Sequence, residues 1–325
     1  MRAIVHQEFG DPTQVLEVAE VPLPEPGPGQ VRLRTVLSPV HNHDLITVTG
    51  NYGFKPELPA RSGSELVGIV DALGEGVDAL SLGQRVASGG TFGAWAEYVV
   101  ADAAGLLPVP AQLDDEAAAQ LISMPFSAIS LLESLGLAAG DWLLQNAANG
   151  AVGRMLAQLA TARGINVVGL VRRSDGVDEL AAQGIGNVVA TDQSDWAAQV
   201  TAITGGAPIK VGVDSVGGKA SGEVLSLLAE GGELVVFGAM ASPRMELSSG
   251  DVIFKQATVR GFWGSKVSGS MPAEQRRALF GELIQRALDG SLTLPVEATY
   301  SFDEVGKAAA GNAVPGRRGK ILLQP

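Results

Sequence analysis

The feature that most restricts the fold is an alternation of two patterns, which begins near Asp114. Short apolar runs take turns with Ala- and Leu-rich segments whose apolar residues recur at helical spacing. The apolar runs read "DWLLQNA", "INVVGLV", "IKVGVDSV" and "GELVVFGAM". Because two parallel strands need a crossover, which is usually a helix, this alternation is typical of βαβ units. It predicts an α/β domain with a parallel sheet over residues 119–290.

Residues 1–118 follow a different pattern, in which short apolar runs such as "QVRLRTVL" and "LVGIVDALG" are separated by turn clusters. This spacing is typical of a β-rich domain. Residues 291–325 return to short strand-like pieces around one helix. Since one helix with a strand pair cannot bury its own apolar side, we predict that residues 291–325 complete the β-rich domain of residues 1–118.

Composition narrows the classes of partner. The chain of 325 residues has no Cys, and its 35 acidic and 23 basic residues give a net charge of -12. The lack of Cys excludes disulfides and thiolate nucleophiles. The negative charge disfavours binding to nucleic acid or to an anionic membrane. No apolar stretch is long enough to span a bilayer, and the first residues lack the apolar centre of a signal peptide, so we expect a cytoplasmic protein.

The turn after "DWLLQ" is predicted to bind the pyrophosphate of a dinucleotide. Small side chains let the backbone approach a phosphate, and the free N–H groups at the start of the next helix attract negative charge. A strand before the turn, a helix after it and a second strand beyond are the context that this motif requires. The residues concerned are Asn149, Gly150, Ala151, Val152 and Gly153.

The second strand of this unit, "INVVGLV", ends at Arg172 and Arg173. A site that prefers NAD would have an acidic residue about here to accept from the ribose 2′-hydroxyl. Two guanidinium groups suit a 2′-phosphate instead, because their planar forks form charge-assisted pairs with phosphate oxygens. The sequence therefore predicts NADPH rather than NADH as the cofactor.

A catalytic zinc would need three convergent ligands, and the candidates are His41, His43, Asp44 and Glu65. His41 and His43 would point to opposite sides of an extended segment. We therefore expect no metal, and we expect these polar groups to form hydrogen bonds within a loop.

Several widely separated words, in one order, resemble the medium-chain dehydrogenase/reductase superfamily and within it the zinc-free branch. That branch contains the quinone oxidoreductases and the 2-enoyl thioester reductases of mitochondrial-type fatty acid synthesis. The words closest to the enoyl thioester reductases are "GNYGFKPELPA" (50–60), "QNAANGAVG" (145–153), "VGGKAS" (216–221), "FGAMA" (237–241), "IFK" (253–255), "RGFWGS" (260–265) and "GKILL" (319–323).

The resemblance covers essentially the whole chain. It implies a GroES-like β-rich catalytic domain and a Rossmann domain with a doubly wound parallel sheet. It further implies that Tyr52 is the proton donor and that Lys320 lies near the cofactor. Two loops would flank the nicotinamide, and their residues are Phe237, Gly238, Ala239 and Met240 in the first, with Phe262, Trp263, Gly264 and Ser265 in the second.

Two positions depart from the pattern of this branch. Many relatives have Asn-Pro where this chain has Met124-Pro125, and "VHNHD" places His41 where the reductases usually have Asn. Both changes fall near the expected substrate site, so they bear on the choice of substrate.

The expected reaction is therefore NADPH-dependent reduction of a carbon–carbon double bond in an α,β-unsaturated thioester, with hydride going to the β-carbon. Charge then develops on the carbonyl oxygen, and the α-carbon needs a proton. A phenol is protonated at neutral pH and can supply it. An NADPH:quinone or alkenal reductase is the alternative, and a non-catalytic NADPH-binding protein is a third reading.

The partners expected are a small-molecule or acyl-thioester substrate and a second copy of the chain. Relatives commonly pair edge strands into a homodimer, and "GELVVFGAM" is read as such an edge strand. Residues 264–277 have the composition of a loop, either a substrate cover or an ordinary connector.

Overall fold

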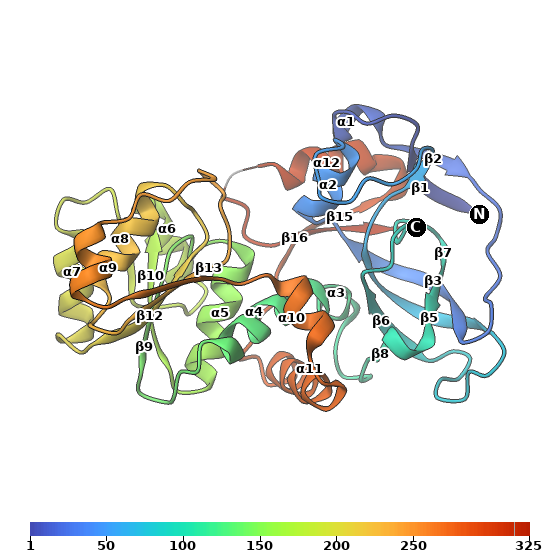
Figure 1. Cartoon of the computed structure of the whole chain (residues 1–325). Helices are drawn as coiled ribbons and strands as arrows, with labels where there is room; N and C mark the ends of the chain where they lie inside the picture. Colours follow the sequence, from blue (N-terminus) through green and yellow to red (C-terminus); the bar gives the residue numbers. More distant parts are fainter. Residues whose placement is uncertain (315) are drawn as a thin grey trace. The chain divides into compact units, whose positions relative to one another are not determined.

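The computed structural model describes residues 1–314 and 316–325, and the side chain of Ser265 lies outside that description. The chain divides into two compact units (Figure 1). Unit 1 comprises Met1–Ser123 and Thr293–Pro325, and unit 2 comprises Met124–Leu292. In the described part of the chain, no helix has the length and apolar character needed to cross a membrane.

Unit 1 is built on a seven-stranded sheet. Its strand order is β15-β16-β3-β5-β6-β8, with β7 also paired to β3. β15 and β16 are parallel, and the other pairs are antiparallel. The strands are β3 (Gln30–Pro39), β5 (Glu65–Leu73), β6 (Arg85–Gly89), β7 (Tyr98–Asp102), β8 (Leu107–Pro108), β15 (Val296–Ser301) and β16 (Lys320–Gln324).

A smaller antiparallel sheet and short helices complete unit 1. The small sheet has the order β2-β1-β4, with β1 (Arg2–His6), β2 (Glu17–Glu20) and β4 (Ala60–Arg61). The helices are α1 (Pro12–Val15), α2 (Asn42–Val48), α3 (Asp115–Ala119) and α12 (Val305–Asn312).

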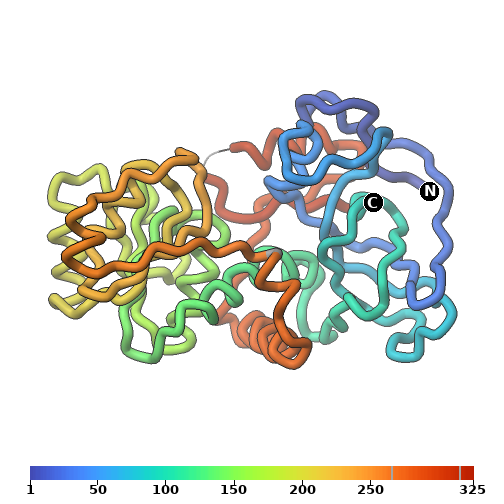
Figure 2. The backbone as a smooth tube through the Cα atoms, viewed as in Figure 1, coloured from blue at the N-terminus to red at the C-terminus, as the bar shows by residue number. Residues whose placement is uncertain are grey.

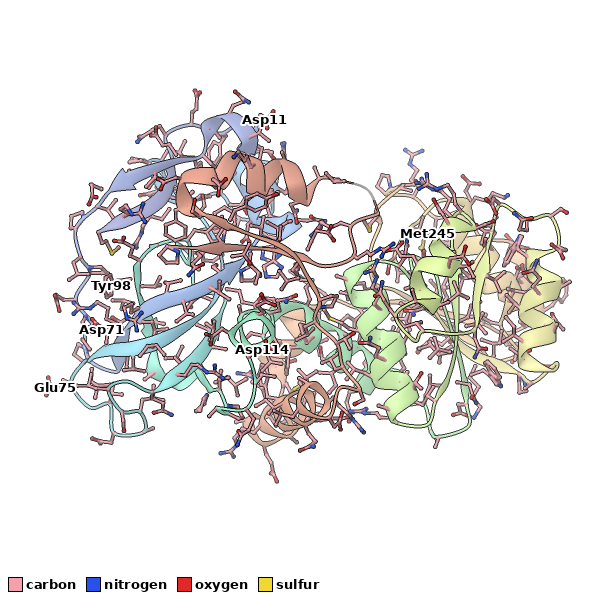
Figure 3. The ribbon with its side chains drawn as sticks, turned by 180° about the vertical axis from the view of Figure 1, so that it is seen from behind. Asp11, Asp71, Glu75, Tyr98, Asp114 and Met245 are labelled. Carbon is pink, nitrogen blue, oxygen red and sulfur yellow. The ribbon has the colours of Figure 1, made fainter. Side chains whose placement is uncertain are left out.

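Apolar and charged side chains alternate along β3 and therefore face opposite sides of the sheet. Val31 and Leu33 point into the core and are fully buried. Arg32, between them, pairs with Asp71 of β5 at 2.7 Å, and its guanidinium carbon lies 5.7 Å from the centre of the Tyr98 ring on β7. Asp71 and Tyr98 are labelled in Figure 3. Adjacent residues of one strand face opposite sides, so the same segment supplies both the core and this cross-strand contact.

The chain leaves unit 1 and later returns to it. Figure 2 shows the red C-terminal part of the tube beside the blue N-terminal part. There β16 pairs with β3 through Leu322 opposite Pro39 and Leu323 opposite Ser38. Residues 293–325 thus belong to the same unit as the first residues, and their last strand lies in its main sheet.

Unit 2 is a parallel sheet of six strands in the order β11-β10-β9-β12-β13-β14. β9 and β12 lie at the centre of the sheet. β10 and β11 follow outward from β9, and β13 and β14 follow outward from β12. The order reverses between β9 and β12, and this reversal is a topological switch point. The strands are β9 (Trp142–Gln145), β10 (Asn166–Val171), β11 (Val188–Ala190), β12 (Ile209–Asp214), β13 (Glu233–Val236) and β14 (Thr258–Gly261).

Helices connect these strands and bury their apolar sides against the sheet. Leu156 and Leu159 of α5, for example, are fully buried at a spacing of one helical turn. The α/β class, with a doubly wound parallel sheet and a β-rich unit, is confirmed. The helices are α4 (Ser123–Ser134), α5 (Ala151–Ala162), α6 (Asp175–Ala181), α7 (Trp196–Thr204), α8 (Lys219–Leu227), α9 (Ser249–Phe254), α10 (Gly264–Ser270) and α11 (Ala273–Leu288).

Two local predictions were wrong. The segment 232–240 is no edge strand, because β13 pairs with β12 on one side and with β14 on the other. The edge of the sheet is β14. Residues 264–277 are helical rather than a loop, since α10 and the start of α11 occupy them.

Candidate functional site

The turn after β9 brings backbone rather than side chains to the carboxyl end of the sheet. Gly150 is the N-cap of α5 and offers no side chain to satisfy the first N–H groups of that helix. A Cβ at Gly153 would lie 2.6 Å from the carbonyl oxygen of Ala147, so α5 can pack this closely on the turn only with glycine there. Asn149 and Gly150 are exposed. An exposed helix start of this kind binds anions.

The next strand places the two arginines at the same edge of the sheet. β10 lies beside β9 in parallel register and ends at Val171. Arg172 and Arg173 follow directly and are exposed. The Nε atom of Arg173 lies 3.5 Å from a carboxylate oxygen of Asp175. The guanidinium groups are thus available to a ligand that extends from the glycine turn.

The two predicted nicotinamide loops follow β13 and β14 and meet each other. The rings of Phe237 and Phe262 are 6.0 Å apart. Phe262 is buried, whereas Met240 is 78% exposed and Trp263 is 70% exposed. Gly238 and Ala239 lie between Phe237 and Met240, and Gly264 begins α10. Ser265, also predicted for this site, has a side chain outside the described residues.

Two polar residues at this edge were missed by sequence reasoning. Asn146 follows β9 directly, and Asp214 is the last residue of β12. Their side chains join at 2.6 Å, from Asn146 Nδ2 to Asp214 Oδ1. A signal was present, because each is a polar residue at the end of an apolar run that predicts a buried strand.

Unit 1 contains a buried chain of titratable side chains. His41 Nε2 lies 2.6 Å from Glu65 Oε2, and His41 Nδ1 lies 3.0 Å from the Lys320 ammonium nitrogen. The other oxygen of Glu65 accepts hydrogen bonds from the backbone N–H groups of Ile122, at 2.7 Å, and Ser123, at 2.9 Å. The N-cap of α2, strand β5 and strand β16 each supply one member of this chain.

Burial controls the protonation of these groups. It raises the pKa of Glu65 to about 7, although hydrogen bonds from the backbone at Ser123 oppose the change. It lowers the pKa of Lys320 to about 8, against the attraction of Glu65. It also lowers the pKa of His41 well below the usual value, with the Lys320 charge acting in the same direction. His41 is therefore a neutral imidazole, which accepts from Lys320 and donates to Glu65.

The two histidines do not lie on opposite sides of an extended segment. Residues 42–48 form α2, His41 precedes it, and the rings of His41 and His43 stack with centres 4.8 Å apart. The extended geometry was therefore wrong for this segment. His43 Nε2 also lies 2.8 Å from the Ser64 hydroxyl.

Tyr52 lies against this stack. Residues 51–59 form neither helix nor strand. The Tyr52 ring is centred 6.0 Å from the His43 ring at an interplanar angle of 30°, and the residue is 44% exposed. Tyr52 is thus a partly exposed loop residue whose ring stacks on His43, and His43 in turn stacks on buried His41.

The predicted site residues form two groups, one in each unit. Tyr52, His41 and Lys320 belong to unit 1. The turn, the arginines and both loops belong to unit 2, together with Met124, which is half-buried near the start of α4. Lys320, whose predicted place is near the cofactor, contacts His41 through its ammonium group.

The metal-ligand candidates form hydrogen bonds with other groups. Among the described residues, no three His, Cys, Asp or Glu side chains converge as a metal ion would need. His41 and Glu65 use their donor and acceptor atoms on each other, on Lys320 and on backbone N–H groups. Asp44 accepts a hydrogen bond from the His41 backbone at 3.0 Å.

Family comparison finds two matches along the chain. Residues 27–111 match the alcohol dehydrogenase GroES-like domain. Residues 151–279 match the family described as zinc-binding dehydrogenase. The first match lies in unit 1 and the second in unit 2.

Individual proteins match over nearly the whole chain. The human mitochondrial enoyl-[acyl-carrier-protein] reductase is 31% identical over 330 residues, which cover 99% of this chain and 88% of that protein. A mycobacterial structure complexed with NADPH is 28% identical, with a TM-score of 0.84 and 100% of both chains covered. A quinone oxidoreductase of Pseudomonas syringae pv. tomato is 26% identical, with a TM-score of 0.86 and coverage of 100% and 99%.

Proposed function

Because this chain belongs to the medium-chain dehydrogenase/reductase superfamily, as an oxidoreductase related to enoyl-[acyl-carrier-protein] reductases and quinone oxidoreductases, we propose that it reduces α,β-unsaturated thioesters with NADPH. The observation that carries the choice of substrate is Tyr52, an exposed phenol held on one face by His43. An enoyl thioester needs such a proton donor after hydride transfer.

Three features of unit 2 fit NADPH. The start of α5 offers backbone N–H groups to a pyrophosphate, and Gly153 lets the helix pack against the turn. Arg172 and Arg173 supply the charge that a 2′-phosphate requires. The loops that begin at Phe237 and Phe262 present apolar surface, which suits a nicotinamide ring. The related mycobacterial protein was solved with NADPH, which supports the same assignment here.

The bound cofactor would supply the hydride that reduces the β-carbon of the substrate. The chain's own residues then have two tasks. Backbone N–H groups or the Tyr52 hydroxyl stabilise the negative charge that develops on the thioester oxygen. Tyr52 gives its proton to the α-carbon, directly or through a water molecule. The stacked His43 ring keeps the phenol in one orientation, which reduces the entropy lost on reaching the reactive geometry.

A quinone or alkenal reductase is the second candidate. The observation that favours it is a pair of exposed rings, Phe54 and Phe92, whose centres are 4.5 Å apart. Phe54 lies two residues after Tyr52 in the same loop. Flat aromatic acceptors stack on such rings. A quinone also accepts electrons readily and takes its protons from water, so it needs no positioned phenol.

Three further features are part of the proposal. We propose that catalysis is independent of zinc, because His41 and Glu65 bind each other and the chain has no Cys. A homodimer stays a prediction from the relatives. A cytoplasmic location stays a prediction from the sequence.

One set of assays separates the candidate functions. NADPH oxidation is followed with crotonyl-CoA, with a long-chain enoyl-CoA, with 1,4-benzoquinone and without an acceptor. Enoyl reduction faster than quinone reduction is the expected result. Rapid turnover of the quinone alone would reassign the protein to the second candidate. NADPH binding without consumption in any assay would indicate a non-catalytic protein. Assays after dialysis against a chelator test zinc independence, and lost activity that zinc restores would refute it.

A further inference from the structure

Asp214 is a fully buried carboxylate that accepts four hydrogen bonds from side chains and backbone. Its Oδ1 atom accepts from Asn146 Nδ2 at 2.6 Å, from Val216 N at 2.9 Å and from Gly217 N at 3.2 Å. Its Oδ2 atom accepts from the Ser221 hydroxyl at 2.5 Å. A charge without water nearby is tolerated only when hydrogen bonds compensate it, and these four bonds do so.

The backbone of Asp214 organises a further loop. Its carbonyl oxygen accepts from Phe237 N at 2.8 Å and from Gly238 N at 3.2 Å. Asn146 completes the link from the other side, since its Oδ1 atom accepts from Ser215 N at 2.7 Å. One residue and its partner thereby join the loops that follow β9, β12 and β13.

The position of this hydrogen-bond network in the sheet relates it to ligand binding. Asn146 follows β9 and Asp214 ends β12, and these two strands flank the point where the strand order reverses. In open α/β sheets the ligand binds at that point, outside the carboxyl ends of the strands. The hydrogen bond between the two side chains therefore spans the switch point beneath the place where a dinucleotide would lie.

We propose that Asp214 is a positioning residue that preorganises the cofactor loops, an inference that rests on the proposed binding of NADPH. It holds the turn at 146–150, its own loop at 215–218 and the loop at 237–240 in one arrangement before the cofactor arrives. Preorganised loops lose less conformational entropy on binding, so Asp214 increases the affinity for the cofactor without contacting it.

The hydrogen bonds of this network reach only some of the segments that would bind a dinucleotide. None of the bonds described above goes to Arg172 or Arg173, which follow β10. Loss of Asp214 should therefore weaken NADPH and NADH by the same factor. Loss of the arginines should instead weaken NADPH alone. Because partial unfolding would also weaken both dinucleotides equally, rescue by Asp214→Asn and a local exchange pattern are needed to identify the positioning role.

The test compares Asp214→Ala with Asp214→Asn. In the asparagine variant, the amide oxygen can still accept from Asn146 and the two backbone groups, and its NH2 group can donate to Ser221. We expect Asp214→Ala to raise the Kd of both dinucleotides by at least about tenfold, because it leaves several buried donors without an acceptor. Asp214→Asn should restore most of the affinity. Glu230→Gln makes the same chemical change at an exposed site before β13 and should have no effect.

Hydrogen exchange of the free protein separates this inference from the proposed function. In Asp214→Ala we expect faster exchange in the loops at 146–150 and 215–218, which the carboxylate bonds, and unchanged exchange in β10. The loop at 237–240 bonds to the backbone carbonyl of residue 214, which the variant keeps, so its exchange should change less. If the wild-type protein binds no dinucleotide and the loops still loosen, the proposed function fails while the structural role of Asp214 stands.

Two other outcomes overturn the inference. One is wild-type affinity in Asp214→Ala, and the other is a changed ratio between the NADPH and NADH constants. Should Asp214→Ala not fold, Asn146→Ala removes only the link across the switch point. It should show the same equal loss for both dinucleotides, and wild-type affinity in that variant would also refute the inference.

Discussion

His41 Nε2 and Glu65 Oε2 lie 2.6 Å apart, and both residues are buried. This contact joins the start of α2 to β5, and Lys320 of β16 extends it on the far side of the imidazole. Three segments that are distant in the sequence thus meet in one hydrogen-bonded chain. His43 stacks on His41 and in turn supports Tyr52. The buried chain therefore underlies the group that we propose as the proton donor.

Tyr52→Phe should lower enoyl reduction by at least about tenfold, within the range of general acid-base catalysis. The variant keeps the ring on His43 and loses only the hydroxyl. The measurement is kcat with crotonyl-CoA. Tyr98→Phe makes the same change on β7 and is the matched control. Unchanged turnover in Tyr52→Phe would reduce Tyr52 to a packing residue, and an unchanged quinone rate beside a lowered enoyl rate would support the proposed role.

His43→Ala should lower kcat by about threefold to tenfold, because one stacked pair contributes roughly 0.5–1.5 kcal/mol. His43→Phe keeps a ring beneath Tyr52 and should retain most of the activity. The decisive quantity is the ratio of the two variants in kcat, with the KM for NADPH unchanged in both. Equal losses in His43→Ala and His43→Phe would assign the effect to the nitrogen atoms of His43 and not to its ring.

Glu65 should make stability depend on pH. Burial raises its pKa to about 7 in the folded protein, from the ordinary value of 4.5 for a glutamate. The folded state therefore binds more protons than the unfolded state between these two values. This stabilising contribution is fully present below the unfolded pKa and is lost as the pH rises through about 7.

Glu65→Gln removes that ionisation and keeps groups that can bond to His41 and to the backbone at Ser123. The difference in unfolding free energy between the variant and the wild-type protein should change across this pH interval in favour of the variant at the higher pH. Urea unfolding from about pH 5 to about pH 8 measures it. Glu75→Gln changes an exposed carboxylate of the same unit and serves as the control. A constant difference for Glu65→Gln would contradict the raised pKa.

Replacing Arg172 and Arg173 together with Ala should remove the preference for NADPH over NADH. Each charge-assisted bond to a phosphate contributes roughly 1.5–3 kcal/mol, so the KM for NADPH should rise by at least about tenfold while that for NADH changes little. Arg277→Ala, at an exposed position on α11, controls for the loss of charge. An equal change in both constants would indicate that the pair does not contact the 2′-phosphate.

The sequence predicted the parts of the fold that depend on short-range pattern. Alternating apolar and helical segments predicted the parallel sheet of unit 2, and the small residues around Gly150 predicted the turn before α5. Residues 264–277 were read as a loop because Gly and Ser weaken helix propensity, yet α10 forms there. A continuous apolar run such as that of β13 is typical of a strand buried on both sides, and here it was mistaken for an edge.

The features that could not be predicted from the sequence depend on contacts between residues that are far apart along the chain. Asn146 and Asp214 are 68 positions apart, and no local pattern indicates that their side chains bond. The stacking of His41 on His43 requires a helix that begins directly after His41. The short polar sequence there gives no local signal that predicts such a helix. The sequence predicted hydrogen bonds within a loop for these histidines, but it could not indicate that Glu65 and Lys320 enclose His41.

The place of β16 has a consequence for biosynthesis. Because β16 lies between β15 and β3, β3 lacks its neighbour on that side until residues 320–324 have been translated. Residues 124–292, which form unit 2, are translated before then. Until then β3 has one open edge, and Lys320 cannot contact His41. We therefore expect the nascent β-rich unit to be the part of this protein that most needs a chaperone.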